Sequence, residues 1–160
     1  MKKILSLFIV VITLSACGET EMQHSEARGM KITAAWLREP PPGSKVTAGY
    51  LSIQNFEKED DRLLGVKSTA AERVEIHEVQ HEGGMARMRE MENGLPVPAN
   101  GSVMLEPGGY HLMFIEPRRT LKLGDAVPLV LFFEKSGEHE VDFWVQSAGP
   151  GNQENSHVHH

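Results

Sequence analysis

The sequence predicts an all-β fold, a sandwich or barrel of about nine short strands. Three observations support this prediction. Short segments with β-branched and aromatic residues recur along the chain, and turn-forming residues separate them. No window of useful length repeats its apolar residues with a helical period. Pro96, Pro98, Gly101, Pro107 and Gly108 interrupt the middle of the chain, which argues further against helices there.

The expected strands share a short length and a turn signal at one or both ends. They are residues 31–37, 47–55, 63–68, 73–80, 85–91, 102–105, 110–115, 126–133 and 138–145. The first ends at a Glu-Pro-Pro-Pro-Gly breaker, and the second alternates partly before a charged turn. The fourth and fifth flank His-Glu-Gly-Gly, and the sixth and seventh flank Pro-Gly-Gly. The last two precede a Gly-Pro-Gly sequence that opens a polar segment.

The two ends of the chain predict segments outside this β domain. Lys2 and Lys3 precede a mostly apolar run that closes with Leu-Ser-Ala-Cys at Cys17. That run is too short to span a membrane, and its ending resembles the bacterial lipobox, in which the cysteine is acylated. We therefore expect a lipoprotein signal peptide (1–16), a lipidated flexible tether (17–29), one β domain (30–147) and a flexible His-containing tail (148–160). The alternative is an ordinary signal peptide with an incidental cysteine.

Charge and cysteine content exclude several functions. Removal of residues 1–16 takes away two of the 16 Lys and Arg residues and none of the 22 acids, so the formal charge becomes −8. This acidic balance argues against binding of nucleic acid, which needs a basic face. Because Cys17 is the single cysteine, the folded domain has none for a disulfide, a thiolate metal site or thiol catalysis.

Four soft or borderline metal donors form the main chemical signal: His77, Met88, His111 and Met113, spaced as H-x10-M-x22-H-x-M. Imidazole suits copper and zinc, whereas an uncharged thioether favours Cu(I). Two donors of each kind would select a monovalent soft ion. The alternative is that the methionines fill the core and the histidines are structural.

Strand periodicity places these donors in two pairs. Residues 73–80 and 85–91 form an expected hairpin, in which a four-residue loop sets His77 opposite Met88. A two-residue Gly-Gly turn would set Met88 opposite Val79 instead, but His77 and Val79 share a face, so His77 and Met88 would still do so. His111 and Met113 are two residues apart in one strand and also share a face. Spacing alone does not show whether the two pairs meet.

Other polar side chains near these donors have simpler interpretations. Met85, Met91 and His81 are spare donors that could assist the site. Glu75 and Glu78, next to His77, are ordinary surface acids of a strand on the simplest interpretation. The final Ser-His-Val-His-His supplies His157, His159 and His160, a candidate auxiliary site for Cu(II) on the tail. The alternative is an incidental tail.

Most of the chain from residue 31 to residue 145 resembles the periplasmic copper chaperone family called PCuAC. The segments that carry this resemblance are residues 41–43, 48–51, 60–63, 74–78, 84–89, 107–113 and 132–135. The family's copper motif is H-x10-M-x21-H-x-M, and His77, Met88, His111 and Met113 fall on its four positions in order. This chain has one extra residue in the second gap, which we expect in the loop-forming stretch 92–101.

The resemblance implies a cupredoxin-like β-sandwich that binds one Cu(I) through two histidines and two methionines. It further implies delivery of copper in the periplasm, towards a cytochrome oxidase subunit or another copper chaperone. We expect a membrane-anchored periplasmic monomer with no catalytic activity, because no catalytic motif rises above background. Two alternatives remain: a copper-sequestering or resistance lipoprotein without a dedicated acceptor, and an interaction module that binds no metal.

Overall fold

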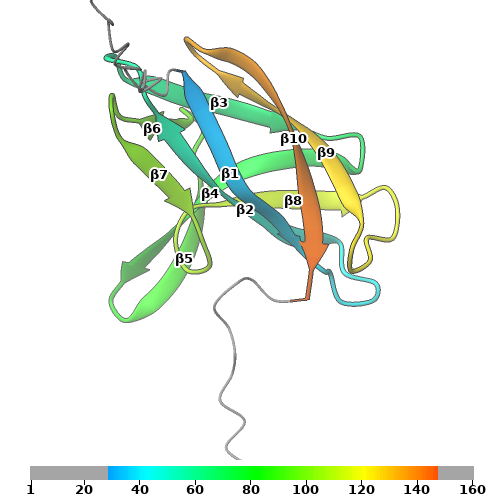
Figure 1. The fold of residues 1–160 in the computed structure, drawn as a ribbon. Helices are drawn as coiled ribbons and strands as arrows, with labels where there is room; N and C mark the ends of the chain where they lie inside the picture. Colours follow the sequence, from blue (N-terminus) through cyan, green and yellow to red (C-terminus); the bar gives the residue numbers. More distant parts are fainter. Residues whose placement is uncertain (1–28, 148–160) are drawn as a thin grey trace, which may run out of the picture.

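The computed structural model describes residues 29–147, and this part of the chain is built from β-strands without a helix (Figure 1). The strands are β1 (Met30–Arg38), β2 (Val46–Asn55), β3 (Asp61–Lys67), β4 (Ala71–Glu82), β5 (Met85–Glu90), β6 (Leu95–Val97), β7 (Ser102–Leu105), β8 (His111–Pro117), β9 (Ala126–Phe133) and β10 (Gly137–Gln146). Within the described residues no helix is long and apolar enough to cross a membrane. The all-β prediction is confirmed.

Seven strands form a closed barrel in the order β4-β8-β2-β1-β10-β9-β3, and β3 returns to β4 through the pair Val66 and Val74. Strands β1 and β10 pair in parallel, whereas the other pairs are antiparallel (Figure 1). The remaining strands extend this barrel: β5 continues from β4 as a hairpin, β6 pairs with β3, and β7 pairs with β2. This barrel with additional strands is a cupredoxin-like architecture.

Alternation along each strand separates the core from the outer face of the sheet. On β8, Leu112 and Phe114 are fully buried, and on β4 Val74 and Ile76 point into the same interior. Residues between them in the sequence must therefore face outward. Here the outer face means the side of the sheet opposite the hydrophobic core.

One short strand was not expected from the sequence. Strand β6 has only three residues and contains Pro96, and the prediction treated this stretch as a loop. The structure tolerates the proline because β6 pairs with β3 alone among the described strands and lies at an edge of the sheet. Leu95 and Val97, on either side of Pro96, are buried in the core.

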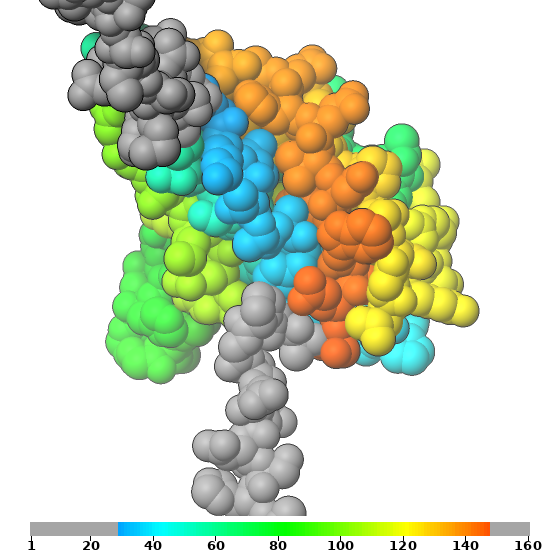
Figure 2. Space-filling view, in the orientation of Figure 1, coloured from blue at the N-terminus to red at the C-terminus, as the bar shows by residue number. Residues whose placement is uncertain are grey.

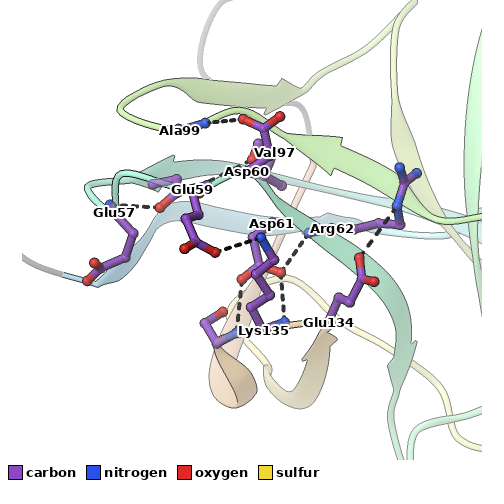
Figure 3. A network of polar contacts seen from close by, with 11 residues as sticks. Glu57, Glu59, Asp60, Asp61, Arg62, Val97, Ala99, Glu134 and Lys135 are labelled. Atoms are coloured by element: carbon purple, nitrogen blue, oxygen red, sulfur yellow. Dashed lines mark hydrogen bonds and ion pairs between the residues drawn. The ribbon is translucent and has the colours of Figure 1, made fainter.

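A buried carboxylate ties the start of β3 to the β9–β10 turn (Figure 3). Asp61 accepts hydrogen bonds from the backbone N–H groups of Arg62 at 2.7 Å, Lys135 at 2.9 Å and Ser136 at 3.0 Å. Burial alone would raise the pKa of Asp61, but these N–H donors outweigh it and hold the pKa below its ordinary value. The carboxylate is therefore part of the structure that closes the barrel.

Candidate metal centre

His77 and His111 are direct partners across the β4–β8 pair. Their ring centroids lie 5.6 Å apart with an angle of 54° between the ring planes. The two residues are 34 positions apart in the sequence, and the antiparallel register of β4 and β8 brings them together. Because Ile76 and Leu112 point into the core, both imidazoles lie on the outer face.

Met113 lies on the same outer face, two residues after His111. Its partner across β4 is Glu75, so the register sets Glu75 and Met113 beside His77 and His111. Same-face positions that follow one another along a strand lie about 6.7 Å apart. The structure thus places Met113 next to the histidine pair on one side.

Met88 lies on the other side of the histidine pair, on the β4–β5 hairpin. Gly83 and Gly84 both have positive φ, +59° and +80°, as a two-residue type I′ turn requires. Met88 is consequently opposite Val79 rather than opposite His77, which pairs with Glu90. The expected pairing of His77 with Met88 through a four-residue loop is wrong. The alternative, a two-residue Gly-Gly turn, is confirmed, and it keeps His77 and Met88 on one face.

The hairpin extends beyond the barrel, and Figure 2 shows its green atoms as a projection at the lower left. All six residues of β5 are exposed, and Met88 has 62% of its surface accessible. A methionine side chain has three rotatable bonds and adapts readily to a partner. Met88 is therefore the most accessible of the four donors and has freedom to move towards the histidine pair.

His111 is buried, with 5% of its surface accessible. Its Nδ1 lies 3.2 Å from the carbonyl oxygen of Gly109, which can only accept a hydrogen bond. Burial lowers the pKa of His111, and the nearby His77 lowers it further, against the opposing effect of the Gly109 carbonyl. A neutral imidazole that donates through Nδ1 carries its lone pair on Nε2, where a metal can bind.

His77 has the opposite arrangement. Its Nε2 lies 2.9 Å from Oε2 of Glu75, while its Nδ1 is buried and has no hydrogen-bond partner within residues 29–147. Glu75 also accepts a hydrogen bond from Arg73 Nε at 2.6 Å. This bond is the main reason that the pKa of Glu75 lies below its ordinary value, and the bond with His77 lowers it further, against burial. A buried ring nitrogen without a partner is uncommon in folded proteins, and this nitrogen is available to a ligand.

Glu75 is thus the site residue that sequence reasoning did not assign. The simple interpretation as a surface acid fits Glu78, whose carboxylate bonds to Gln80 at 2.7 Å on the other face of β4. It does not fit Glu75, because Glu75 shares the outer face with His77. The signal was available in the spacing, since residues 75 and 77 must point the same way in any strand.

Comparisons with known proteins identify a family that covers nearly all of the described residues. Residues 30–145 match the model of the LpqE-like family, whose description is that of a lipoprotein. The chain belongs to the LpqE-like family. A relative of this LpqE-like chain is Lxx21020 of Leifsonia xyli subsp. xyli, which is named as a lipoprotein. The two sequences are 26% identical over 149 residues, which cover 90% of this chain and 89% of the relative.

Solved structures of PCuAC domains resemble the barrel and confirm the expected resemblance to that family. The copper-bound PCuAC domain from PmoF2 has a TM-score of 0.63 and 29% identity, covering 76% of this chain and 97% of the domain. The solution structure of the Cu(I) form of DR1885 from Deinococcus radiodurans has a TM-score of 0.60 and 25% identity, covering 82% of this chain and 86% of that protein.

Several predicted functional residues lie outside the described residues: Cys17 of the expected lipid anchor, and His157, His159 and His160 of the expected auxiliary site. Their assignments, like the segment boundaries at residues 16 and 29, stay predictions.

Proposed function

We propose that this chain is a periplasmic metallochaperone that binds one Cu(I) ion through His77, Met88, His111 and Met113 and passes it to another protein. The observation that carries the proposal is the shared outer face of these four donors, with the two imidazoles adjacent at its centre. The PCuAC domains of similar fold, two of them solved with copper, support the same assignment. In this proposal copper is cargo and the chain has no catalytic role.

The donor set fits Cu(I) chemically. Thioethers favour a soft monovalent ion and need no deprotonation, so they remain donors in acidic surroundings. The Nδ1 of His77, which has no hydrogen-bond partner among the described residues, and the Nε2 of His111 complete a set of four neutral donors with the two thioethers. Thioethers also escape the disulfide chemistry that disables thiolates in an oxidising compartment.

The exposure of the donors fits transfer of copper rather than permanent storage. His111 is buried, whereas Met88 is the outermost donor on a projecting hairpin. A ligand of an acceptor protein can reach the ion most easily at Met88 and replace that thioether first. The inner donors then hold the ion until the exchange is complete.

Titration of the mature chain, meaning the chain without residues 1–16, with Cu(I) in competition with a chromogenic chelator tests the binding site. We expect His77→Ala and Met113→Ala to weaken Cu(I) binding by at least about tenfold, equal to about 1.4 kcal/mol, with an unchanged fold. His139→Ala is the matched control, because His139 is a histidine of β10, which pairs with β9 and carries none of the four donors. Unchanged affinity and stoichiometry in both site variants would reject the assignment.

Delivery requires a separate experiment. We propose that the acceptor is a cytochrome oxidase subunit that houses a copper centre, or a second copper chaperone. Mixing the Cu(I)-loaded chain with the purified apo subunit should move copper to the subunit, detected by metal analysis after separation. Retention of copper on this chain against every acceptor offered would instead support sequestration, the function expected of a resistance lipoprotein.

The anchor and the tail are proposed from the sequence and from the lipoprotein description of the family. We propose that an acyl group on Cys17 holds the protein at a membrane facing the periplasm. Replacement of Cys17 by Ser should release the protein from the membrane fraction. Titration with and without residues 148–160 counts any Cu(II) bound by the terminal histidines.

A further inference from the structure

Glu75 and His77 form a contact that is largely shielded from water. The two residues are two positions apart on β4, and the side chains of His77 and Glu75 are 15% and 17% exposed. Oε2 of the carboxylate lies 2.9 Å from Nε2 of the imidazole. At this exposure the contact is much less screened than an ion pair on the open surface.

The second carboxylate oxygen is also occupied. Arg73 Nε lies 2.6 Å from Oε1 of Glu75, so an arginine and a histidine hold the two oxygens from the two sides. An ionised carboxylate can only accept hydrogen bonds. The proton between Glu75 and His77 therefore belongs to Nε2 of His77, and in the neutral ring the lone pair is on Nδ1.

His111 carries the opposite tautomer. Its Nδ1 faces the carbonyl oxygen of Gly109 at 3.2 Å, so Nδ1 donates and Nε2 keeps the lone pair. The two adjacent imidazoles thus offer different nitrogens. The Nδ1 of His77 is also buried, and no residue in the described part of the chain offers it a hydrogen bond.

We propose that Glu75 is a positioning residue for copper: it holds His77 as the Nε2–H tautomer, so that His77 binds Cu(I) through Nδ1 while His111 binds it through Nε2. This inference rests on the proposed function and specifies the atoms of that site. A carboxylate bound to the remote nitrogen of a ligating histidine fixes the ring orientation and makes the ligating nitrogen more basic. Arg73 keeps Glu75 in place and balances its charge.

The test compares Glu75→Ala with Glu78→Ala in the mature chain. Glu78 is the matched control, because it is one residue from His77 but bonds to Gln80 on the other face. Long-range ¹H–¹⁵N NMR spectra of the apo protein report which ring nitrogen carries the proton. We expect Nε2–H at His77 in the wild type and in the Glu78 variant, and a mixture of tautomers after Glu75→Ala.

Cu(I) affinity should fall in the variants in which His77 loses the Nε2–H tautomer. Loss of a carboxylate behind a ligating histidine typically costs about 10- to 100-fold in metal affinity, and we expect a loss of that size for Glu75→Ala and none for Glu78→Ala. Glu75→Gln keeps an oxygen that accepts from Nε2, so it should recover part of both the tautomer and the affinity. This variant also covers the case in which the alanine variant fails to fold.

Two results would overturn the inference. One is Nδ1–H at His77 in the apo wild type, and the other is a Cu(I)-loaded spectrum in which Nε2 of His77 carries the metal. Either result with intact Cu(I) binding rejects the role of Glu75 and leaves the chaperone assignment standing. A wild-type chain that binds no Cu(I) rejects the proposed function and the copper role of Glu75 together.

Discussion

At the scale of single residues, a comparison of two exposed methionines distinguishes a copper ligand from a methionine that is merely exposed. Met88 and Met104 have 62% and 59% of their surfaces accessible. Both lie on the outer face of the sheet, because Met104 pairs with Ser52 while its neighbour Leu105 is buried in the core. Met88 lies on β5, which pairs with β4, the strand of His77, whereas Met104 lies on β7, which pairs with β2. The two residues differ in position and hardly at all in exposure.

Met88→Ala should therefore weaken Cu(I) binding by at least about tenfold, and Met104→Ala should leave it within about twofold. Neither change should lower the free energy of unfolding by more than about 0.5 kcal/mol, because exposed side chains contribute little to the core. Chelator competition measures the affinity, and urea unfolding measures the stability. Equal affinities in the two variants would mean that Met88 is not a ligand.

At the scale of strands, the sequence predicted periodicity better than register. The shared face of His77 and Met88, and that of His111 and Met113, followed from alternation alone, and the first did not depend on the turn between β4 and β5. The pairing of His77 with His111 could not be predicted, because it joins strands separated by three others in the sequence. Strand β6 was missed because a three-residue strand with a central proline has no periodicity to detect.

The packing of β2 against β8 depends on a residue without a side chain. A Cβ at Gly49 would lie 2.9 Å from the ring of Phe114 and 3.3 Å from the ring of Phe143, and both rings are fully buried. Gly49 pairs with Leu112, next to His111, so this close approach sets where β8 lies on the barrel. In contrast, a Cβ at Gly65 on β3 would have no atom within 4 Å.

We expect Gly49→Ala to lower the free energy of unfolding by about 1–3 kcal/mol, because close-packed rings must shift to make room for the methyl group. Gly65→Ala should change it by less than about 0.5 kcal/mol, since the position is open. The urea midpoints of the two variants, at an unchanged slope, measure the difference. A similar loss at both positions would show that the close approach at Gly49 is not the cause.

At the scale of the whole molecule, barrel closure depends on β3. This strand pairs with β9 at four positions but with β4 only through Val66 and Val74. At its first residue, Asp61 holds the β9–β10 turn through the N–H groups of Lys135 and Ser136 (Figure 3). None of these groups belongs to the candidate metal centre. Stability and copper binding should therefore respond to different substitutions.

Asp61→Asn should lower the free energy of unfolding at pH 7 by about 1.5–3 kcal/mol, the usual contribution of hydrogen bonds to a charged group. Because the folded pKa of Asp61 lies below its ordinary value, the ionised carboxylate stabilises the fold fully above about pH 4, the unfolded pKa. This contribution is lost as the pH falls through the folded pKa. The stability difference between wild type and variant should consequently shrink in urea unfolding series below about pH 4.

Asp60→Asn is the control for that experiment, because Asp60 is the adjacent carboxylate and accepts one backbone N–H, from Ala99 at 2.8 Å. We expect a smaller loss there at pH 7, since a single bond at an exposed position is replaced. Cu(I) affinity should be unchanged in both variants, because neither aspartate contacts the histidine pair. A stability difference for Asp61→Asn that stays constant from pH 7 into acid would contradict the role of its charge, and leave only the shape of the side chain to close the barrel.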